Sequence, residues 1–246
     1  MSGHSKWATI KHAKGAADAK RGQVFTKLIK EISIAARMGG GNPDGNPRLR
    51  TAIIKARVAN MPKDNIERAI KKGTGELEGV NYEELVYEAY APGGVALLIE
   101  VLTDNKNRAA ADVRNMLTKA GGQLATSGAV SRLFKRQGLI TLDGEKYTED
   151  QVMEAAIEGG AQDVALSDGI IEVITEPEDF EAVANALSGK NFETMSAQIS
   201  MVPDSDVSLD NDATAKVLKL IDRLEENDDV QNVYSNISIP DGFSAE

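Results

Sequence analysis

Apolar residues recur at helical spacing through the first third of the chain. Between positions 24 and 36 they fall three and four residues apart, which predicts a helix with one buried stripe. A glycine run ends this helix, and Asn46-Pro47 predicts the start of a second one, with Asn as N-cap and Pro at the first helical position. A short third stripe covers residues 66–70 and is expected to stop at Gly73. Residues 1–75 therefore predict a small three-helix domain.

The pattern changes to strands after residue 76. Apolar runs at 85–90 and 95–102 flank Ala91-Pro92-Gly93-Gly94, which predicts a hairpin. A helix is expected over 109–120 and another strand over 130–134.

A second mixed pattern begins at Gly138. Strands are expected at 139–142, 163–166, 170–175 and 197–202, with helices at 148–158 and 177–187. That order is βαββαβ, the ferredoxin-like unit, and it is complete in itself. A helix over 213–226 and a strand over 230–237 are left over. We expect them to complete the preceding ββαβ pattern into a second α+β layer.

These elements predict an α+β multidomain protein of three parts. The first is a basic three-helix N-terminal domain, residues 1–75. The second is an α+β middle domain made of residues 76–136 and 204–246. The third is an acidic ferredoxin-like domain, residues 137–203, inserted into the middle domain.

Charge is distributed unevenly along the 246 residues. The net charge is −10, yet residues 1–72 hold 16 Lys and Arg against 5 Asp and Glu, whereas residues 73–246 hold 12 against 33. This asymmetry predicts a basic arm for a polyanion attached to an acidic body. Residues 137–203 hold two lysines against 14 acids, and their central strands lack the aromatic residues that bind RNA bases. Spacing, dimerisation or contact with a basic protein is the role expected for that segment.

Most catalytic chemistry is excluded by composition. The chain has no cysteine and only two histidines, and it contains neither a phosphate-binding P-loop motif nor a Gly-x-Ser-x-Gly motif. We therefore predict no enzymatic activity, no catalytic residue, no metal site and no cofactor. The N-terminus lacks the apolar segment of a secretory signal, and no apolar run approaches the ~20 residues of a spanning helix. A cytoplasmic protein without membrane contact is expected.

Two basic clusters are the candidate nucleic-acid contacts, because Lys and Arg bind phosphates and release counterions. The second cluster lies between an expected strand and a helix N-terminus, where backbone N–H groups favour an anion. Three alternatives stay open: Trp7 anchors the arm on the helical core, the lysines form a solvated helix face, and the second cluster is a plain helix cap. The candidates are Lys6, Trp7, Lys11, Lys14, Lys20, Arg21, Lys27, Lys30, Arg48, Arg50, Lys55 and Arg57 in the first cluster, and Lys106, Arg108 and Arg114 in the second.

Several short motifs are spread over essentially the whole chain. They are Gly3-His4-Ser5-Lys6-Trp7, Arg21 with Phe25-Thr26-Lys27, Gly39-Gly40-Gly41-Asn42-Pro43, Asn60-Met61-Pro62, Arg68-Ala69-Ile70-x-Lys72-Gly73, Tyr87-Glu88-Ala89-Tyr90-Ala91-Pro92-Gly93-Gly94 and Asp104-Asn105-x-Asn107-Arg108. Together these motifs resemble the YebC family. The resemblance implies the same three domains, with the ferredoxin-like one inserted. It also implies a probable transcriptional regulator that binds DNA, although mitochondrial relatives activate translation and bacterial members are connected with the ribosome and proline-rich stretches.

Three functional hypotheses follow from the residues and the resemblance. The first is a DNA-binding transcriptional regulator, the second is a translation factor that binds ribosomal RNA, and the third is a scaffold whose acidic body binds a basic partner. Helix 48–59 carries arginines but no Asn or Gln, which favours recognition of backbone or shape over base reading. The expected partner is DNA or ribosomal RNA, with the ribosome as a candidate, and the oligomeric state is left open.

Overall fold

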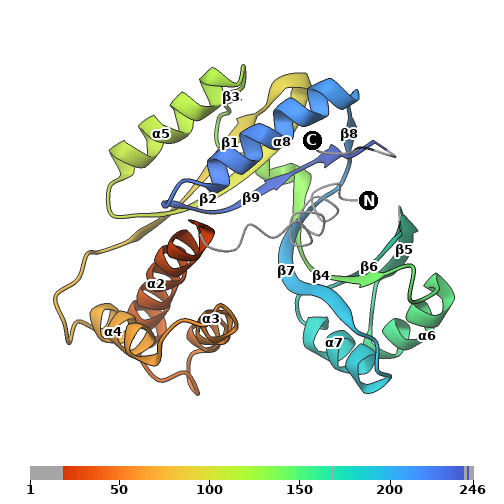
Figure 1. Ribbon diagram of the computed structural model, residues 1–246, viewed down its shortest axis with the longest axis horizontal. Coiled ribbons are helices and arrows are strands. Elements are labelled where there is room, and N and C mark those ends of the chain that lie inside the picture. The colour runs from red at the N-terminus through yellow and green to blue at the C-terminus, as the bar shows by residue number, and fades with distance from the viewer. Residues whose placement is uncertain (1–18, 168, 241–242, 244–246) are drawn as a thin grey trace.

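The computed structural model describes residues 19–167, 169–240 and 243 of the chain. Figure 1 shows three groups of elements: a helical region, a middle region in which two helices lie over a sheet, and a second α/β region beside the helical one. The mixed α+β class predicted from the sequence is confirmed. The domain boundaries at residues 75, 136 and 203 stay predictions.

The helical region contains α2 (Ala19–Gly39), α3 (Pro47–Val58) and α4 (Lys63–Thr74), at the positions predicted from the apolar stripes. Gly73 does not stop α4 as expected, because the left-handed residue that ends the helix is Gly75, at φ 83°. The buried side chains between the three helices are Ile32, Ala35, Ala36, Leu49, Ala52, Ile53, Ala56, Met61, Ile66 and Ala69.

Asn46 joins the end of α2 to the start of α3. Its side-chain oxygen accepts a hydrogen bond from the Leu49 N–H at 3.1 Å, which confirms the predicted N-cap. Its Nδ2 donates to the carbonyl oxygens of Ala35 at 2.8 Å and Gly40 at 2.9 Å. One buried amide therefore satisfies orphan groups at both helix ends and fixes the angle between the helices.

Gly73 allows α4 to approach α2 closely. A Cβ atom on Gly73 would lie 2.3 Å from the Ser33 carbonyl oxygen and 2.9 Å from the Ala36 Cβ. The Ser33 hydroxyl donates to the Ala69 carbonyl oxygen at 3.1 Å across the same contact. The first of those distances is shorter than any real contact, so a larger residue here must push the helices apart.

We expect Gly73→Ala to lower the free energy of unfolding by about 1–3 kcal/mol, because overpacking forces backbone shifts. Gly22→Ala in α2 is the matched control, since nothing lies within 4 Å of its Cβ position. Alanine is the better helix former, so the control should raise stability by about 0.5–1 kcal/mol. Urea unfolding followed by circular dichroism measures both, and changes of the same sign would contradict the close-packing argument.

The middle region is built on a four-stranded antiparallel sheet in the order β3-β1-β2-β9. Its strands are β1 (Glu83–Tyr90), β2 (Ala96–Thr103), β3 (Gln123–Leu124) and β9 (Val230–Ser235), and the turn η1 (Pro92–Gly94) joins β1 to β2. The helices α5 (Lys106–Lys119) and α8 (Asn211–Glu225) pack against the sheet. The two-residue strands β8 (Val207–Ser208) and β10 (Ile237–Ser238) pair beside it. The core between sheet and helices contains Leu97, Ile99, Leu117, Ile221, Leu224 and Val233.

The second α/β region comes from the chain between β2 and β9, so the middle sheet combines strands from both sides of it (Figure 1). Its element order, βαββαβ, is the one predicted, and its antiparallel sheet runs β5-β6-β4-β7. Its core contains Ile140, Leu142, Val152, Ala156, Ile171, Val173, Val183 and Leu187. The elements are β4 (Phe134–Asp143), α6 (Glu149–Gly159), β5 (Asp163–Ser167), β6 (Ile170–Thr175), α7 (Phe180–Gly189) and β7 (Thr194–Pro203).

The strand predicted over 130–134 is wrong. Residues 131–133 form a 3₁₀ turn, η2 (Ser131–Leu133), and Phe134 instead begins the long strand β4. The backbone N–H groups of Val130 and Ser131 donate to the Glu88 carboxylate rather than to a neighbouring strand. The Glu88 carboxylate, about 40 positions away in the sequence, therefore takes the place of the backbone hydrogen bonds to a neighbouring strand that an apolar run would otherwise form.

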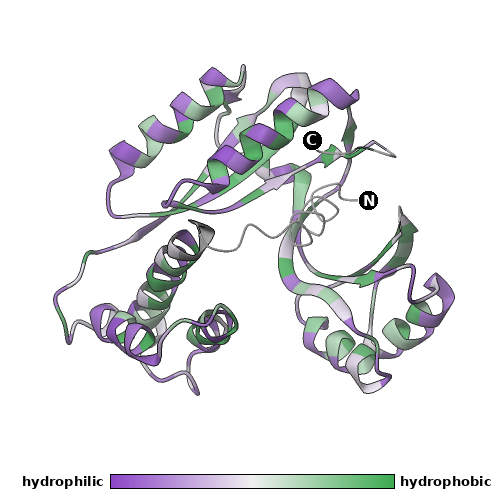
Figure 2. Cartoon of the chain, viewed as in Figure 1, coloured by the Kyte–Doolittle hydropathy of each residue, from purple (hydrophilic) through white to green (hydrophobic). Residues whose placement is uncertain are grey.

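Hydropathy follows this architecture. Figure 2 shows hydrophobic residues along the strands and the inner faces of the helices, with hydrophilic residues on the outer faces. None of the helices in the described part of the chain combines the length and hydropathy needed to cross a lipid bilayer.

Candidate nucleic-acid interface

Two polar side chains of α2 contact the last turn of α8. The Lys27 Nζ donates to the Glu225 carbonyl oxygen at 2.6 Å, and the Gln23 Nε2 donates to the Glu226 carbonyl oxygen at 2.8 Å. The last carbonyls of a helix lack backbone partners and carry its partial negative charge, so a lysine there is favourable. Lys27, a predicted phosphate contact, thus helps to hold the helical region against the middle region.

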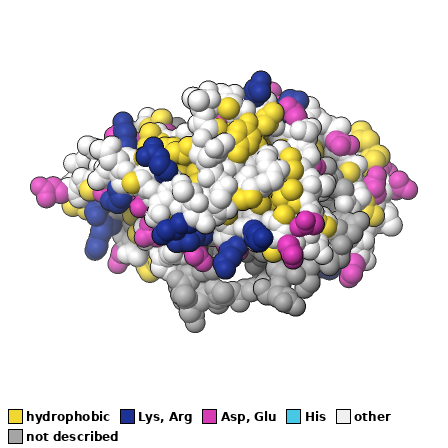
Figure 3. Space-filling model, turned by 90° about the horizontal axis from the view of Figure 1, so that it is seen from above, with side chains coloured by type: hydrophobic (Ala, Val, Ile, Leu, Met, Phe, Trp, Pro, Cys, Tyr) yellow, Lys and Arg dark blue, Asp and Glu magenta, His cyan; other side chains and the backbone are white. Residues whose placement is uncertain are grey.

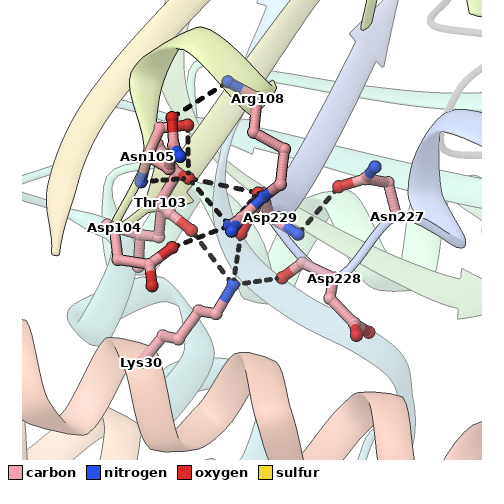
Figure 4. Close-up of polar contacts among 9 residues, drawn as sticks. Lys30, Thr103, Asp104, Asn105, Arg108, Asn227, Asp228 and Asp229 are labelled. Atoms are coloured by element: carbon pink, nitrogen blue, oxygen red, sulfur yellow. Dashed lines mark hydrogen bonds and ion pairs between the residues drawn. The ribbon is translucent and has the colours of Figure 1, made fainter. Parts of the chain in front are cut away.

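Lys30 lies deeper in the same contact, only 7% exposed (Figure 4). Its Nζ lies 2.6 Å from the Asp229 Oδ1, 2.9 Å from the Asp228 carbonyl oxygen and 3.3 Å from the Leu102 carbonyl oxygen. These acceptors use all three donors of the ammonium group. The expectation that Lys30 lies on a solvated face is therefore wrong. The buried carboxylate and the two carbonyl groups stabilise its positive charge in place of solvent.

Arg108 reaches the other oxygen of the same carboxylate. Its Nη2 lies 2.8 Å from the Asp229 Oδ2 and 2.7 Å from the Asp104 Oδ1, and the Thr103 hydroxyl also donates to Asp229, at 3.1 Å. Figure 4 shows these groups converging from α2, the start of α5 and the start of β9. The two basic clusters that the sequence separates therefore meet at one acid.

Asp229 is only 4% exposed, whereas its neighbour Asp228 is exposed. Burial alone would raise the pKa of this carboxyl, but hydrogen bonds and charge from Lys30 and Arg108 lower it below its usual range. The same contacts raise the pKa of Arg108. Asp229 is consequently held ionised between two cations from different regions.

The start of α5 has the arrangement of a capped helix. The Asn105 side chain accepts from the Arg108 N–H at 3.0 Å, and the Thr103 hydroxyl accepts from the Asn105 N–H at 3.0 Å. Lys106 pairs with Glu83 at 2.5 Å. The helix-cap alternative thus describes this segment, and its first two cations have carboxylate partners. Arg114, two turns further along α5, is exposed.

Arg48 is a further predicted cation that pairs internally. Its guanidinium donates to both Glu31 oxygens, at 2.7 and 3.0 Å, and also contacts Glu84. These hydrogen bonds raise the pKa of Arg48. The side chain therefore links α3 to α2 and to β1 rather than standing free on the α3 surface.

The outer side of α3 carries the cations that remain accessible. Lys55 and Arg57 are exposed, and no ion pair joins either to a carboxylate of a described residue. Arg50 is also exposed, and its side-chain donors reach the carbonyl oxygens of Pro43 and Asp44. Ile54 and Val58 of the same helix are also exposed, at 53% and 78%. We call this set, residues 50, 54, 55, 57 and 58, the α3 face.

Several predicted contacts lie outside what the structure describes. Lys6, Trp7, Lys11 and Lys14 precede the described residues. Lys20 and Arg21 belong to α2, but their side chains are not described.

Sequence reasoning missed further charged groups on α4. Arg68, Lys71 and Lys72 are exposed, and within the described chain none of them forms an ion pair. The signal was present, because Arg68 and Lys72 are four residues apart and so share one helix face. The count of Lys and Arg over residues 1–72 included these three, but none of them was chosen as a candidate contact.

Glu88 is a second group that the sequence did not single out. This carboxylate is 8% exposed and accepts backbone N–H bonds from Gly128 at 2.7 Å, Val130 at 2.6 Å and Ser131 at 2.8 Å. Burial raises its pKa, but these three hydrogen bonds outweigh burial and lower it. The group therefore holds the loop before β4 in place.

Charge remains segregated on the folded surface. In Figure 3 the Lys and Arg side chains predominate on the left of the upper face, and Asp and Glu predominate towards the right. That view is from above Figure 1, so it shows mainly the middle region, with the helical region and the second α/β region beneath it. A polyanion approaching this face is therefore attracted to one part of it and repelled from the other. Among the described residues no group of three potential metal ligands occurs.

Comparison with known proteins gives consistent relatives over the whole length. The chain is 68% identical over 243 residues to a "Probable transcriptional regulatory protein" of Treponema denticola, covering 99% of this chain and 98% of the relative. A protein of the same name from Treponema pallidum is 66% identical over 240 residues, covering 98% of each chain. The crystal structure of a conserved hypothetical protein from Aquifex aeolicus matches with a TM-score of 0.79 and 49% identity, covering 91% of this chain and 93% of that one.

Two family models divide the chain between them. The TACO1/YebC protein N-terminal domain matches residues 5–76, and the TACO1/YebC second and third domain matches residues 82–237. Together with the full-length relatives, these matches show that the chain belongs to the TACO1/YebC family.

Proposed function

We propose that this protein is a non-enzymatic regulator of gene expression that binds the phosphate backbone of DNA. The observation that carries the proposal is the α3 face, where Arg50, Lys55 and Arg57 are exposed and have no carboxylate partner among the described residues. These cations are exposed although the chain as a whole carries a net charge of −10. The names of the relatives, which are called probable transcriptional regulatory proteins, agree with this role.

The composition of the α3 face favours contact with backbone over base reading. Bases are read by Asn, Gln, Glu, Asp or Arg at base edges, and the exposed side chains of α3 include arginines but neither amides nor carboxylates. Lys55 and Arg57 each supply a phosphate contact that is independent of sequence and sensitive to salt.

A translation factor bound to ribosomal RNA is the second candidate. The observation that favours it is the same lack of amide side chains on α3, because recognition by shape and phosphate suits a folded RNA as well as a duplex operator. The α3 face could contact the phosphates of either duplex DNA or ribosomal RNA. Binding experiments with both therefore distinguish the two candidate functions.

The double variant Lys55→Ala/Arg57→Ala is expected to weaken binding to a fluorescent 30-base-pair DNA duplex by about 10- to 100-fold at low salt. Each lost phosphate contact should also reduce the slope of log affinity against log salt by about 0.9. Fluorescence anisotropy over a series of KCl concentrations measures both quantities. Purified ribosomes and duplexes of unrelated sequence are titrated in parallel to identify the target class.

The matched control is Lys216→Ala/Lys219→Ala on α8, which removes two exposed lysines and the same charge. It should change affinity less than threefold. Equal losses in both double variants would show that only net charge matters, and wild-type protein that binds neither duplex nor ribosome would refute nucleic-acid binding itself.

A further inference from the structure

We propose that a hollow between α2 and α4 is a phosphate-binding site that contacts the nucleic-acid backbone separately from the α3 face. The hollow has a volume of about 210 Å³ and is lined by Ile29 of α2 and by Asn65, Arg68, Ala69 and Lys72 of α4. The inference deepens the proposed function, because it assigns a second contact to the same helical region. Figure 1 shows α4 and α3 on opposite sides of α2, so the two contacts are distinct.

The polar groups around the hollow are suited to an anion. Asn65, Arg68 and Lys72 are spaced by three and four residues, which places them on one face of α4. The guanidinium and ammonium groups only donate hydrogen bonds, and the Asn65 amide adds two further donors. Among the residues that the structure describes, no carboxylate lines the hollow. A tetrahedral anion seated there would face the donors of Asn65, Arg68 and Lys72.

The neighbouring acids leave Arg68 and Lys72 unpaired. Glu67 accepts from Lys63 at 3.4 Å, and although Asp64 lies one turn before Arg68, no ion pair joins the two. Arg68 and Lys72 therefore stand as like charges four residues apart, an arrangement that disfavours a helix. Their position near the helix C-terminus offsets part of that repulsion. A bound phosphate would remove the remainder by placing negative charge between them.

The size and floor of the hollow limit the ligand further. Sites for drug-sized molecules occupy roughly 300–1,000 Å³, so this one suits a single phosphate group with its waters. Its floor is the apolar surface of Ile29 and Ala69, and Ala69 is only 1% exposed. The floor supplies no recognition of a base or sugar, which leaves the charged group as the recognised part of the ligand.

The test compares two double variants of the full chain, Arg68→Gln/Lys72→Gln and the matched control Lys63→Gln/Lys71→Gln. The control removes the same amount of charge from the same helix, at residues that do not line the hollow. The probe is the fluorescent 30-base-pair duplex at 50 mM KCl. We expect the first variant to lose at least tenfold in affinity and the salt slope to fall by about 2, whereas the control loses less than threefold. The charge-conserving Arg68→Lys/Lys72→Arg should recover most of the loss.

Losses of equal size in the Arg68/Lys72 variant and the control would overturn the site, even if the α3 face is upheld. A second arm titrates inorganic pyrophosphate against wild type and the Arg68/Lys72 variant by NMR. If wild type binds no nucleic acid, the proposed function fails, yet pyrophosphate binding that the variant lacks would still support a site for free phosphates. Pyrophosphate binding that is absent or unchanged in the variant would then overturn the site as well.

Discussion

Asp229→Ala is expected to lower the free energy of unfolding by about 3–5 kcal/mol. Lys30 is buried, and its ammonium depends on the Asp229 carboxylate 2.6 Å away. Removing one partner of a buried ion pair leaves the other charge uncompensated, which costs about this much. Arg108 contributes less to this loss of stability, because Asp104 still accepts a hydrogen bond from its guanidinium and its side chain is partly exposed.

Asp228→Ala is the matched control for this variant. Its side chain is exposed, and the contact with Lys30 uses its backbone carbonyl, which survives the substitution. We expect a change within about 0.5 kcal/mol. Urea unfolding measures both variants, and hydrogen exchange of the α2 amides reports whether the helical region separates first. A loss below 1 kcal/mol in Asp229→Ala would contradict the role assigned to the ion pair.

This contact changes how substitutions of the α2 lysines must be interpreted. Lys27 and Lys30 bind carbonyl and carboxylate oxygens of the middle region, and Lys30 also lies 5.7 Å from the ring centroid of Tyr82. A variant that replaces them would weaken nucleic-acid binding indirectly if the helical region shifts. Substitutions on the α3 face avoid that ambiguity, because among the described residues no hydrogen bond or ion pair of its side chains reaches another region.

Glu88→Ala is expected to cost at least about 3 kcal/mol of unfolding free energy. Three buried or part-buried N–H groups lose a charged acceptor, and hydrogen bonds to charged groups contribute about 1.5–3 kcal/mol each. Glu88→Gln should lose about half as much, because its amide oxygen still accepts. Glu154→Ala, an exposed carboxylate on α6, should be neutral. Thermal and urea unfolding measure the series.

The lowered pKa of Glu88 also predicts the pH dependence of stability. Because the folded protein binds its proton more weakly than the unfolded chain, the contribution of this group is complete above the usual glutamate pKa of about 4.3 and is lost as pH falls further. Asp229 acts in the same direction. Glu88→Gln should therefore lose less stability than wild type between pH 4.5 and 3, and equal slopes would contradict the assignment.

The sequence by itself determined the regular elements and the division of charge. Apolar spacing placed the three helices of the helical region and both α/β patterns, and the Asn46-Pro47 start of α3 was legible because capping acts within four residues. These are local effects, so residue type and spacing suffice. The resemblance to the YebC family rested on motifs along the whole chain and agrees with the family matches.

Only the tertiary structure decided which charges are free. Lys30 and Asp229 are 199 residues apart, and Lys30 looks on the sequence like Lys55, which faces solvent. On the sequence Gly73 resembles a helix stop, but in the structure it is a close-packing position against Ser33. Residues 130–134 resemble a strand, but the Glu88 carboxylate binds their backbone N–H groups. Whether a side chain is buried or ion-paired depends on residues from distant segments of the chain. Because those residues set the energy of a charged group, its state cannot be predicted from spacing along the chain.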